Sequence, residues 1–178
     1  AVKEMVAYHT YAHYKASGVE WLGEVPQHWN VATLYRCIAY DRRLTYGIVQ
    51  AGPKLDVGIP YIRPADMTGD GIPSVVYLPK TSARIAEGYS RSAVSEGDIV
   101  MSIGPSFGKV AIARAEHTGA NLTQGTARIA IDKVHHARYF LWLLRSYNVQ
   151  QYWASVATGA TFPALNLEPL GRTVLPIP

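Results

Sequence analysis

The sequence predicts an α+β fold: a single globular domain with a sheet-rich centre and one main helix near the C-terminal end. Between residues 44 and 131, short runs rich in β-branched and aromatic residues are bounded by Gly and Pro, which is typical of strands separated by turns. From about Ala137 to Ala157, apolar residues instead recur at helical spacing. The length of 178 residues suits one compact domain or at most two small ones.

The expected elements follow one another along the chain. The segment 17–29 has no clean period and is expected to be irregular, held in place by the buried indoles of Trp21 and Trp29. Strands are expected at Val31–Leu34, Pro60–Arg63, Val75–Leu78, Asp98–Ile103, Lys109–Arg114 and Arg128–Ile131. The helix is expected to end at Thr158-Gly159, and a loop and a final strand over 174–178 follow it.

Composition excludes several classes of protein. The 17 Lys and Arg exceed the 13 Asp and Glu and give a net charge of +4, a mild excess that favours an anionic partner. The longest apolar run, Tyr139–Leu144, is far shorter than the roughly 20 residues that span a bilayer. The N-terminal residues lack the pattern of a signal peptide, and the single Cys37 excludes an intrachain disulfide and a cysteine-based zinc site. A cytoplasmic protein is therefore expected.

The positive charge is unevenly distributed along the chain. Residues 1–100 carry ten basic and ten acidic side chains, whereas residues 101–178 carry seven basic and three acidic ones. A second local excess of basic residues lies within 36–63. The two basic stretches could meet on one face, although on charge alone ordinary solvated surfaces are the better explanation.

No catalytic constellation is visible in the sequence. The segment Gly104–Val110 is only superficially like a phosphate-binding loop, because Val stands where Ser or Thr must bind magnesium. The adjacent His135 and His136 have no carboxylate at a spacing that would complete a metal site. The aspartates of the central region also lack the Glu-x-Lys companion of a metal-dependent nuclease. These observations favour binding over catalysis.

A DNA-binding surface needs cations that neutralise phosphates and polar side chains that reach base edges. Three polar segments combine both kinds of group: 41–54, 102–109 and 121–128. Two alternatives stay open at the level of single residues. Asn121 and Gln124 also suit hydrogen bonds within a turn, and Arg63 also suits a partly buried ion pair with Asp66.

One segment has a far more specific pattern. The stretch Tyr14-Lys-Ala-Ser-Gly-Val-Glu-Trp-Leu-Gly-Glu-Val-Pro-Gln-His-Trp29 closely resembles the opening of target-recognition domains in the specificity subunits of type I restriction–modification systems. That opening typically has Asp in place of Ala16 and Ile in place of Val25. Other similar segments are Ile59–Met67, Gly97–Met101, Asn121–Gln124, Thr158–Asn166 and Leu175–Pro178. The resemblance covers nearly the whole chain from Tyr14 onward.

The resemblance implies a non-catalytic domain that reads DNA. A specificity subunit of this family has two such domains, joined by two long helices that act as a spacer, and each domain reads one half of a split DNA target. The expected organisation here is an N-terminal lead-in over 1–16 and one target-recognition domain over 17–178. The spacer helix that normally follows Leu-Pro-Ile-Pro is absent from this chain, which would therefore be a truncated or half-length subunit.

The resemblance also implies which partners and cofactors take part. Methyltransferase subunits bind S-adenosylmethionine and methylate adenine, and restriction subunits hydrolyse ATP and cut DNA. S-adenosylmethionine, ATP and magnesium are therefore expected in partner subunits, and no cofactor or metal is expected in this chain. The expected partners are double-stranded DNA, the methyltransferase subunits and, through the complex, the restriction subunits, with no membrane.

The residues expected to contact DNA lie in the polar segments. Phosphate contacts are assigned to Arg42, Arg43, Lys54 and Lys109, base-edge contacts to Arg63, Gln124 and Arg128, and further contacts to Tyr46, Ser106 and Thr123. The main alternative is a scaffold or remnant domain that docks a methyltransferase subunit without binding DNA, and a stand-alone nuclease is a weaker one. No code maps these residues to bases, so the half-site itself is not predicted.

Overall fold

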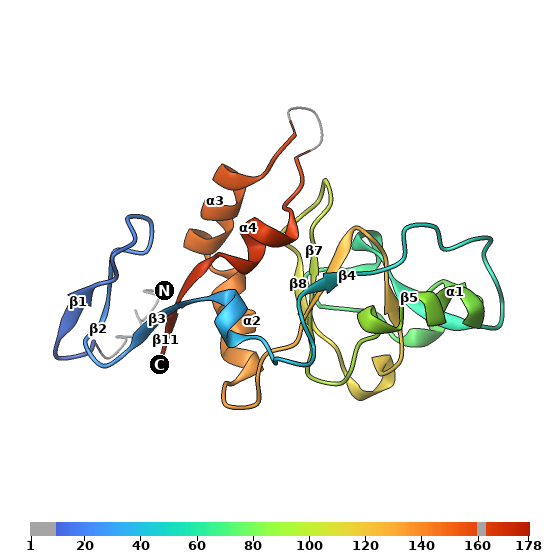
Figure 1. The fold of residues 1–178 in the computed structure, drawn as a ribbon, viewed down its shortest axis with the longest axis horizontal. Helices are drawn as coiled ribbons and strands as arrows, with labels where there is room; N and C mark the ends of the chain where they lie inside the picture. The colour runs from blue at the N-terminus through green and yellow to red at the C-terminus, as the bar shows by residue number, and fades with distance from the viewer. Residues whose placement is uncertain (1–9, 160–162) are drawn as a thin grey trace, which may run out of the picture.

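The computed structural model describes residues 10–159 and 163–178, which form layers along one long axis (Figure 1). The hairpin of the first two described strands and a strand pair that includes the C-terminal strand lie at one end, helices come next, and a four-stranded sheet follows. The strands are β1 Tyr14–Ala16, β2 Glu24–Pro26, β3 Asn30–Thr33, β4 Thr45–Tyr46, β5 Ile59–Ile62, β6 Lys80–Thr81, β7 Ile99–Ser102, β8 Val110–Ile112, β9 Asn121–Leu122, β10 Thr126–Ile129 and β11 Val174–Ile177. The α-helices are α1 Ala83–Gly88, α2 Ala137–Arg145, α3 Tyr147–Val156 and α4 Leu167–Gly171.

The central sheet has the strand order β4-β10-β7-β8, and all of its pairs are antiparallel. Every residue of β7 and β10 is buried, because apolar side chains cover both faces. Ile99 and Met101 belong to the core formed with the helices, whereas Val100 between them belongs to a second core on the opposite face. Successive residues of a strand point to opposite faces, so one short strand contributes to both cores.

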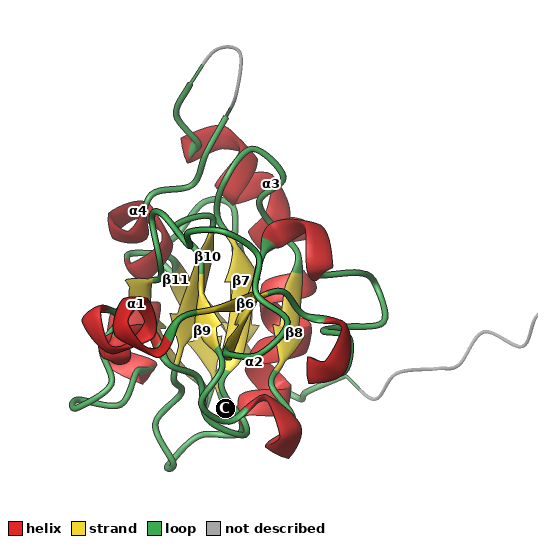
Figure 2. Cartoon of the chain, turned by 90° about the vertical axis from the view of Figure 1, so that its right-hand side faces the viewer, coloured by secondary structure: helices red, strands yellow, loops and turns green. Residues whose placement is uncertain are grey.

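Three smaller sheets extend this centre. Strands β6, β5 and β9 form a three-stranded sheet, in which β5 and β9 are parallel. Strand β11 pairs with β3 and so brings the C-terminal segment back to the first part of the fold. Figure 2 shows the strands at the centre of the molecule, with helices and loops around them. The predicted α+β class is confirmed.

The single long helix predicted over 137–157 is wrong, because the chain forms two helices that are separated at Ser146. Ser146 has an extended backbone, with φ −64° and ψ 149°. The buried side chains Phe140, Leu144, Val149 and Trp153 explain the break. A step of four residues rotates a helix by about 40° beyond a full turn, whereas the five-residue step from Leu144 to Val149 rotates it by about 140°. The break at Ser146 changes the direction of the chain, so that Val149 and Trp153 pack into the same core as Phe140 and Leu144.

Two other predicted elements also differ from the structure. The predicted strand Val75–Leu78 is wrong, since Val75–Tyr77 is a 3₁₀ turn. The segment predicted to be irregular contains β2, which pairs with β1 in a hairpin. Its indoles are half-buried rather than buried: Trp21 stacks on Tyr152 with ring centroids 4.8 Å apart, and Trp29 makes an edge contact with Tyr139.

The other predicted strands are confirmed with shifted ends. Strands β3, β5, β7, β8, β10 and β11 lie in or overlap the predicted ranges. Helix α4 lies in a segment that the sequence predicts to be loop. Residues 160–162, which belong to the family-like segment 158–166, lie outside the described residues. Among the described residues, no helix is both long and apolar enough to cross a membrane.

The close approach of β9 to the chain after β4 yields a stability prediction. The backbone N–H of Ile48 donates to the carbonyl of Leu122 at 2.7 Å, and a Cβ at Gly47 would overlap that same carbonyl. We expect Gly47→Ala to destabilise the fold by about 2–3 kcal/mol, because backbone atoms cannot yield as side chains do. Urea unfolding measures the effect, and Gly69→Ala is the control because nothing lies near its Cβ. Equal midpoints for the two variants would contradict the predicted overlap.

Candidate nucleic-acid interface

Four loops meet at one end of the central sheet, which we call the loop end. They are the loops that follow β4, β5, β7 and β9. Strand β7 ends there at Ser102, and its antiparallel partner β10 begins there at Thr126. Hydrogen bonds join the loops to one another. The N–H of Ile103 donates to Gly125 at 2.8 Å, and the Lys109 ammonium donates to the Pro64 carbonyl at 2.9 Å. Segments that are far apart in the sequence thus form one surface.

Six of the ten residues predicted to contact DNA lie at the loop end: Tyr46, Arg63, Ser106, Lys109, Thr123 and Gln124. Gln124 and Ser106 are exposed, and Tyr46 is 38% exposed. Tyr46 and Gln124 also line a hollow of about 310 Å³ together with Asn166. The loop end therefore presents amide, phenol and hydroxyl groups beside a cation.

The open alternative at Arg63 is resolved by its geometry. The Arg63 guanidinium forms a two-point ion pair with Asp66, at 3.0 Å from Nε and 2.7 Å from Nη2. Its side chain nevertheless stays 47% exposed. The ion pair fixes the guanidinium without hiding it, so Arg63 keeps a donor surface that faces solvent.

Lys54 lies in a separate groove that adjoins Arg63. This groove has a volume of about 360 Å³, and Lys80, Tyr61, Val76 and Tyr77 are among its other lining residues. The Lys80 ammonium donates to the backbone carbonyl of Asp56 at 2.9 Å. Tyr77 is 80% exposed and Val76 is 69% exposed. We call Val76 and Tyr77 the tip, and sequence reasoning did not identify it because its residues were assigned to a strand.

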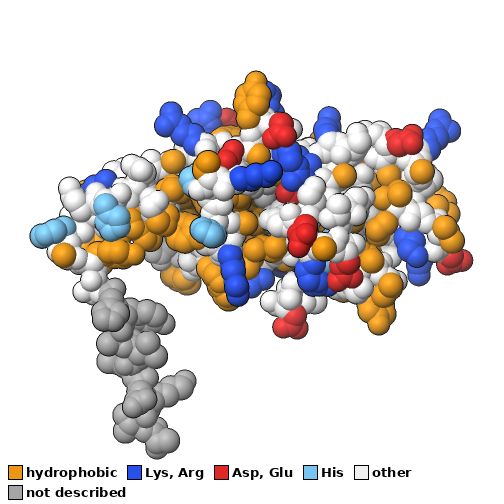
Figure 3. Space-filling model, turned by 90° about the horizontal axis from the view of Figure 1, so that it is seen from below, with side chains coloured by type: hydrophobic (Ala, Val, Ile, Leu, Met, Phe, Trp, Pro, Cys, Tyr) orange, Lys and Arg blue, Asp and Glu red, His pale blue; other side chains and the backbone are white. Residues whose placement is uncertain are grey.

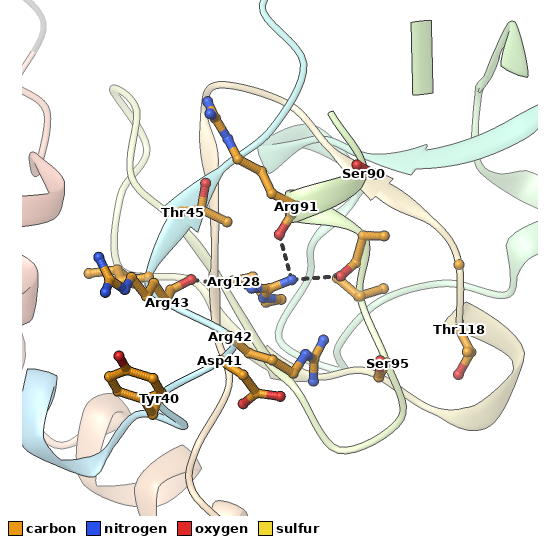
Figure 4. A pocket seen from close by; sticks show the side chains of 14 residues that line it. Tyr40, Asp41, Arg42, Arg43, Thr45, Ser90, Arg91, Ser95, Thr118 and Arg128 are labelled. Carbon is orange, nitrogen blue, oxygen red and sulfur yellow. Dashed lines mark hydrogen bonds between the residues drawn. The ribbon is translucent and has the colours of Figure 1, made fainter. Parts of the chain in front are cut away.

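The remaining predicted residues, Arg42, Arg43 and Arg128, lie at the opposite end of the sheet around a hollow of about 830 Å³ (Figure 4). Arg128 is only 5% exposed. Its Nη1 donates to the carbonyls of Arg91 at 2.6 Å and Ala93 at 2.9 Å, and its Nη2 donates to the carbonyl of Arg43 at 3.2 Å. One guanidinium therefore holds three backbone segments together, and we call this arrangement the Arg128 clamp.

The structure shows Arg128, which the sequence assigns to a base contact, as a buried side chain. Burial lowers the pKa of Arg128, and the nearby charge of Arg42 lowers it further. Its buried Nε has no hydrogen-bond partner among the described residues. Both terminal nitrogens of this guanidinium are occupied by backbone carbonyls inside the fold. The sequence does not reveal this burial, because residue type alone does not distinguish a buried arginine from an exposed one.

Arg42 and Arg43 differ from Arg128 in exposure. Arg42 forms a two-point ion pair with Asp98, with both N···O distances at 2.6 Å. Arg43 is exposed, and its guanidinium lies 5.9 Å from the ring centre of Tyr40. In Figure 4 the side chains of Arg43 and Arg91 point away from the Arg128 guanidinium, toward which their carbonyls are directed. The clamp thus places two cations on the rim of the hollow.

Asn121 has a structural role, as the alternative of turn hydrogen bonding suggested. It is buried, and its amide nitrogen donates to the carbonyls of Ala86 at 3.2 Å and Tyr89 at 3.3 Å. Its side-chain oxygen accepts from the hydroxyl of Ser92. These bonds fasten α1 to β9, so Asn121 is not available to DNA. Its neighbour Gln124 is exposed instead.

A network of charged and polar groups holds the tip from behind, and we call it the brace. The Glu116 carboxylate accepts from the Ser74 hydroxyl at 2.6 Å and from both Nε and Nη2 of Arg114, at 2.9 and 2.6 Å. Arg114 also donates to the carbonyl of Ile72. The buried His117 ring bonds the Pro73 carbonyl at 2.8 Å. The turn Ala115–His117 therefore fixes the segment that leads into the tip.

Charge on the visible surface is mixed rather than concentrated. Seen from below, Lys and Arg side chains are interspersed with Asp and Glu, and hydrophobic side chains gather toward the N-terminal end (Figure 3). This face is therefore not singled out by charge as a binding surface. In the part of the chain that the structure describes, no group of three or more His, Cys, Asp or Glu side chains could hold a metal ion.

Comparisons with known proteins agree on one family. The family model described as type I restriction modification DNA specificity domain matches residues 49–178. Over 155 residues the chain is 32% identical to the type I restriction enzyme EcoBI specificity subunit of Escherichia coli. This match covers 86% of the chain and 32% of that protein, so the chain spans about a third of the length of its relative.

Solved structures show the same fold at low sequence identity. The HsdS subunit from Thermoanaerobacter tengcongensis matches with a TM-score of 0.61 and 16% identity, over 93% of this chain and 36% of that one. The S subunit of a type I restriction–modification system from M. genitalium matches with a TM-score of 0.53 and 14% identity, over 84% and 34%. A chain from a structural study of complex assembly in the type I R-M system has a TM-score of 0.64 and 17% identity, over 93% and 37%.

The Arg128 clamp predicts a large effect of a conservative substitution. Arg128→Lys removes the planar set of donors, so at least one of the three carbonyls loses its partner inside the fold. We expect a loss of about 2–4 kcal/mol in the free energy of unfolding. Arg172→Lys is the control, because Arg172 pairs with Glu168 on the surface, and a change below about 0.5 kcal/mol is expected there. Urea unfolding that shows equal small losses in both variants would refute the clamp.

The brace predicts a specific pH dependence of stability. The Ser74 hydroxyl and then Arg114 lower the pKa of Glu116 from 4.5 to about 2. A carboxyl with a lowered pKa contributes its stability above its unfolded pKa, and this contribution disappears as the pH falls toward the folded value. We therefore expect wild type to lose more stability between pH 5 and pH 2.5 than Glu116→Gln loses.

The measurement is the urea midpoint of each protein at several pH values in this interval. Glu87→Gln is the matched control, because Glu87 is exposed and lies outside the brace. Its curve should follow that of wild type. Parallel curves for wild type and Glu116→Gln would show that the brace does not form in solution.

Proposed function

We propose that this chain, which belongs to the family of type I restriction–modification DNA specificity domains, recognises a DNA sequence as one target-recognition domain of a specificity subunit. One observation carries the proposal beyond family membership. Six of the ten residues predicted from sequence to contact DNA lie together at the loop end, on four loops that hydrogen bonds join to one another. A surface formed from separate rigid loops can vary in sequence while the sheet beneath it stays unchanged.

The groups at the loop end suit the two kinds of contact that DNA recognition needs. The Lys109 ammonium supplies positive charge for phosphates, and the half-exposed Arg63 guanidinium supplies donors for the base edges to which the sequence assigns it. The exposed amide of Gln124 can form two hydrogen bonds with the edge of adenine, and Ser106 and Tyr46 supply hydroxyl groups. The loop Ile103–Gly108 is held by the Ser102 hydroxyl, which donates to the Ser106 carbonyl at 2.7 Å.

The proposed domain is one part of a larger reader. Because the chain spans about a third of the EcoBI subunit, we propose that it reads one half of a bipartite target. The proposed domain starts no later than Tyr14 rather than at residue 17, because β1 pairs with β2. Methyltransferase and restriction subunits are its proposed protein partners in the cytoplasm. The domain itself is proposed to be non-catalytic, with S-adenosylmethionine, ATP and magnesium bound by those subunits.

A docking role without DNA binding is the second candidate. Trp142 is 62% exposed and Tyr147 is 75% exposed, on the adjacent helices α2 and α3. Exposed aromatic side chains of this kind are common at protein interfaces. Titration of the chain with random duplex DNA at low salt, with and without a methyltransferase subunit, separates the two functions. Binding of DNA only in the presence of that subunit would favour the docking role.

The loop end predicts two distinct DNA-binding defects. Lys109→Ala should weaken binding to all sequences and reduce the slope of log affinity against log salt by about 1. Gln124→Ala should instead cost about 1–3 kcal/mol at one base position and leave the salt slope unchanged. Fluorescence anisotropy with a library of duplexes measures both effects.

Arg172→Ala is the control for loss of an exposed arginine elsewhere on the fold. It should change neither the sequence preference nor the salt slope. If Lys109→Ala and Gln124→Ala both behave like Arg172→Ala while wild type binds duplex DNA, the loop end is not the DNA-binding surface.

A further inference from the structure

The tip combines three features that single exposed apolar residues lack. Val76 and Tyr77 are adjacent and both largely exposed, at 69% and 80%, although the flanking Val75 and Leu78 pack into the second core. Isolated apolar residues on a surface are common and need no explanation. Two neighbours directed outward from an anchored turn are a more specific arrangement, and the other two features concern what lies behind and beside them.

Behind the tip, the brace fixes the backbone in one conformation. Ser74 and the N–H of Val75 both donate to the Glu116 carboxylate, at 2.6 and 3.3 Å. Hydrogen bonds from Arg114 and His117 hold the carbonyls of Ile72 and Pro73. A side chain on a pre-ordered turn loses less conformational entropy when it binds than one on a mobile loop. The brace therefore suits a turn that presents Tyr77 to a partner.

Beside the tip, the groove carries an excess of positive charge. Lys54 and Lys80 line it, and the hydrogen bond of Lys80 goes to a backbone carbonyl rather than to a carboxylate. In the described part of the chain, the ion pairs are formed by arginines and include neither of these lysines. Asp56 also lines the groove, but the ammonium groups of Lys54 and Lys80 together with Arg63 outnumber this one acidic residue, and they flank an exposed aromatic ring and a valine. An apolar protein surface would leave these ammonium groups without compensation.

We propose that the tip enters a groove of duplex DNA, where Tyr77 and Val76 contact the base edges or sugars while Lys54 and Lys80 bind the flanking phosphates. This inference rests on the proposed function and adds a specific apolar contact to it. Apolar side chains that enter a groove between cationic contacts are a known mode of DNA recognition. The tip borders the same groove as Arg63, so this contact is continuous with the loop end.

The test compares two tyrosines of similar exposure on different surfaces. Tyr77 is 80% exposed at the tip, and Tyr147 is 75% exposed on α3. Affinity of the full chain for a duplex pool is measured by anisotropy at several salt concentrations without any partner subunit, and binding of a methyltransferase subunit is measured separately. Tyr77→Ser should lower the affinity about ten-fold without changing the salt slope, because the lost contact is apolar. Tyr77→Phe should stay within about three-fold of wild type because it keeps the ring.

The lysines give the complementary result. Lys54→Ala and Lys80→Ala should each reduce the salt slope by about 1, because each removes one phosphate contact. Val76→Asp places a negative charge at an exposed position and should weaken binding at least as strongly as Tyr77→Ser. Thermal unfolding midpoints close to that of wild type confirm that the variants fold. If Tyr77→Ser does not fold, Val76→Asp is the decisive variant.

The outcomes separate this inference from the proposed function. If wild type binds no duplex under any of these conditions, the proposed function fails, and the inference fails with it. If wild type binds and Tyr77→Ser and Val76→Asp behave like Tyr147→Ser, the inference alone is overturned. If these two tip variants keep wild-type DNA affinity but bind the methyltransferase subunit more weakly, the tip is a protein contact, and the inference is again overturned.

Discussion

The strands β7 and β10 are buried on both faces, and the placement of the functional surfaces depends on this constraint. Ile99 and Met101 pack against the helices, whereas Val100 packs into the core on the other side. A shift of one residue would move each of these side chains to the opposite core, so the register of the pair is strongly specified. The loops that leave its ends inherit that register, which is why segments distant in sequence form one hydrogen-bonded surface.

The two ends of this pair use arginine in opposite ways. At one end, Arg128 lies inside the fold and satisfies three carbonyls, so its contribution is to hold backbone segments together. Near the loop end, Arg63 is fixed by Asp66 but keeps about half of its side chain in solvent. The first arrangement stabilises a surface from beneath, and the second forms part of a surface. Residue type alone cannot distinguish them, because the difference is one of depth.

Local patterns predicted what local interactions determine. Strand β7 was predicted because its apolar run is bounded by turn residues, and the structure buries every residue of the strand. The break at Ser146 was missed because helical spacing is visible on each side of it, although the five-residue interval between Leu144 and Val149 was a signal. The brace had no local signal at all, since Ser74 and Glu116 are 42 residues apart. Contacts of this kind arise only when the fold brings the two segments together.

Arg63 connects the two surfaces proposed to contact DNA. Its side chain lines the groove beside Tyr77, and the Pro64 carbonyl, one residue further on, accepts from Lys109 at the loop end. The Asp66 carboxylate also accepts from the Arg63 backbone N–H at 2.9 Å, which fixes this turn at both its backbone and its side chain. A duplex that contacts the loop end and the tip together would cross this turn. The ion pair with Asp66 therefore acts less as a source of stability than as a support that keeps the two surfaces in one orientation.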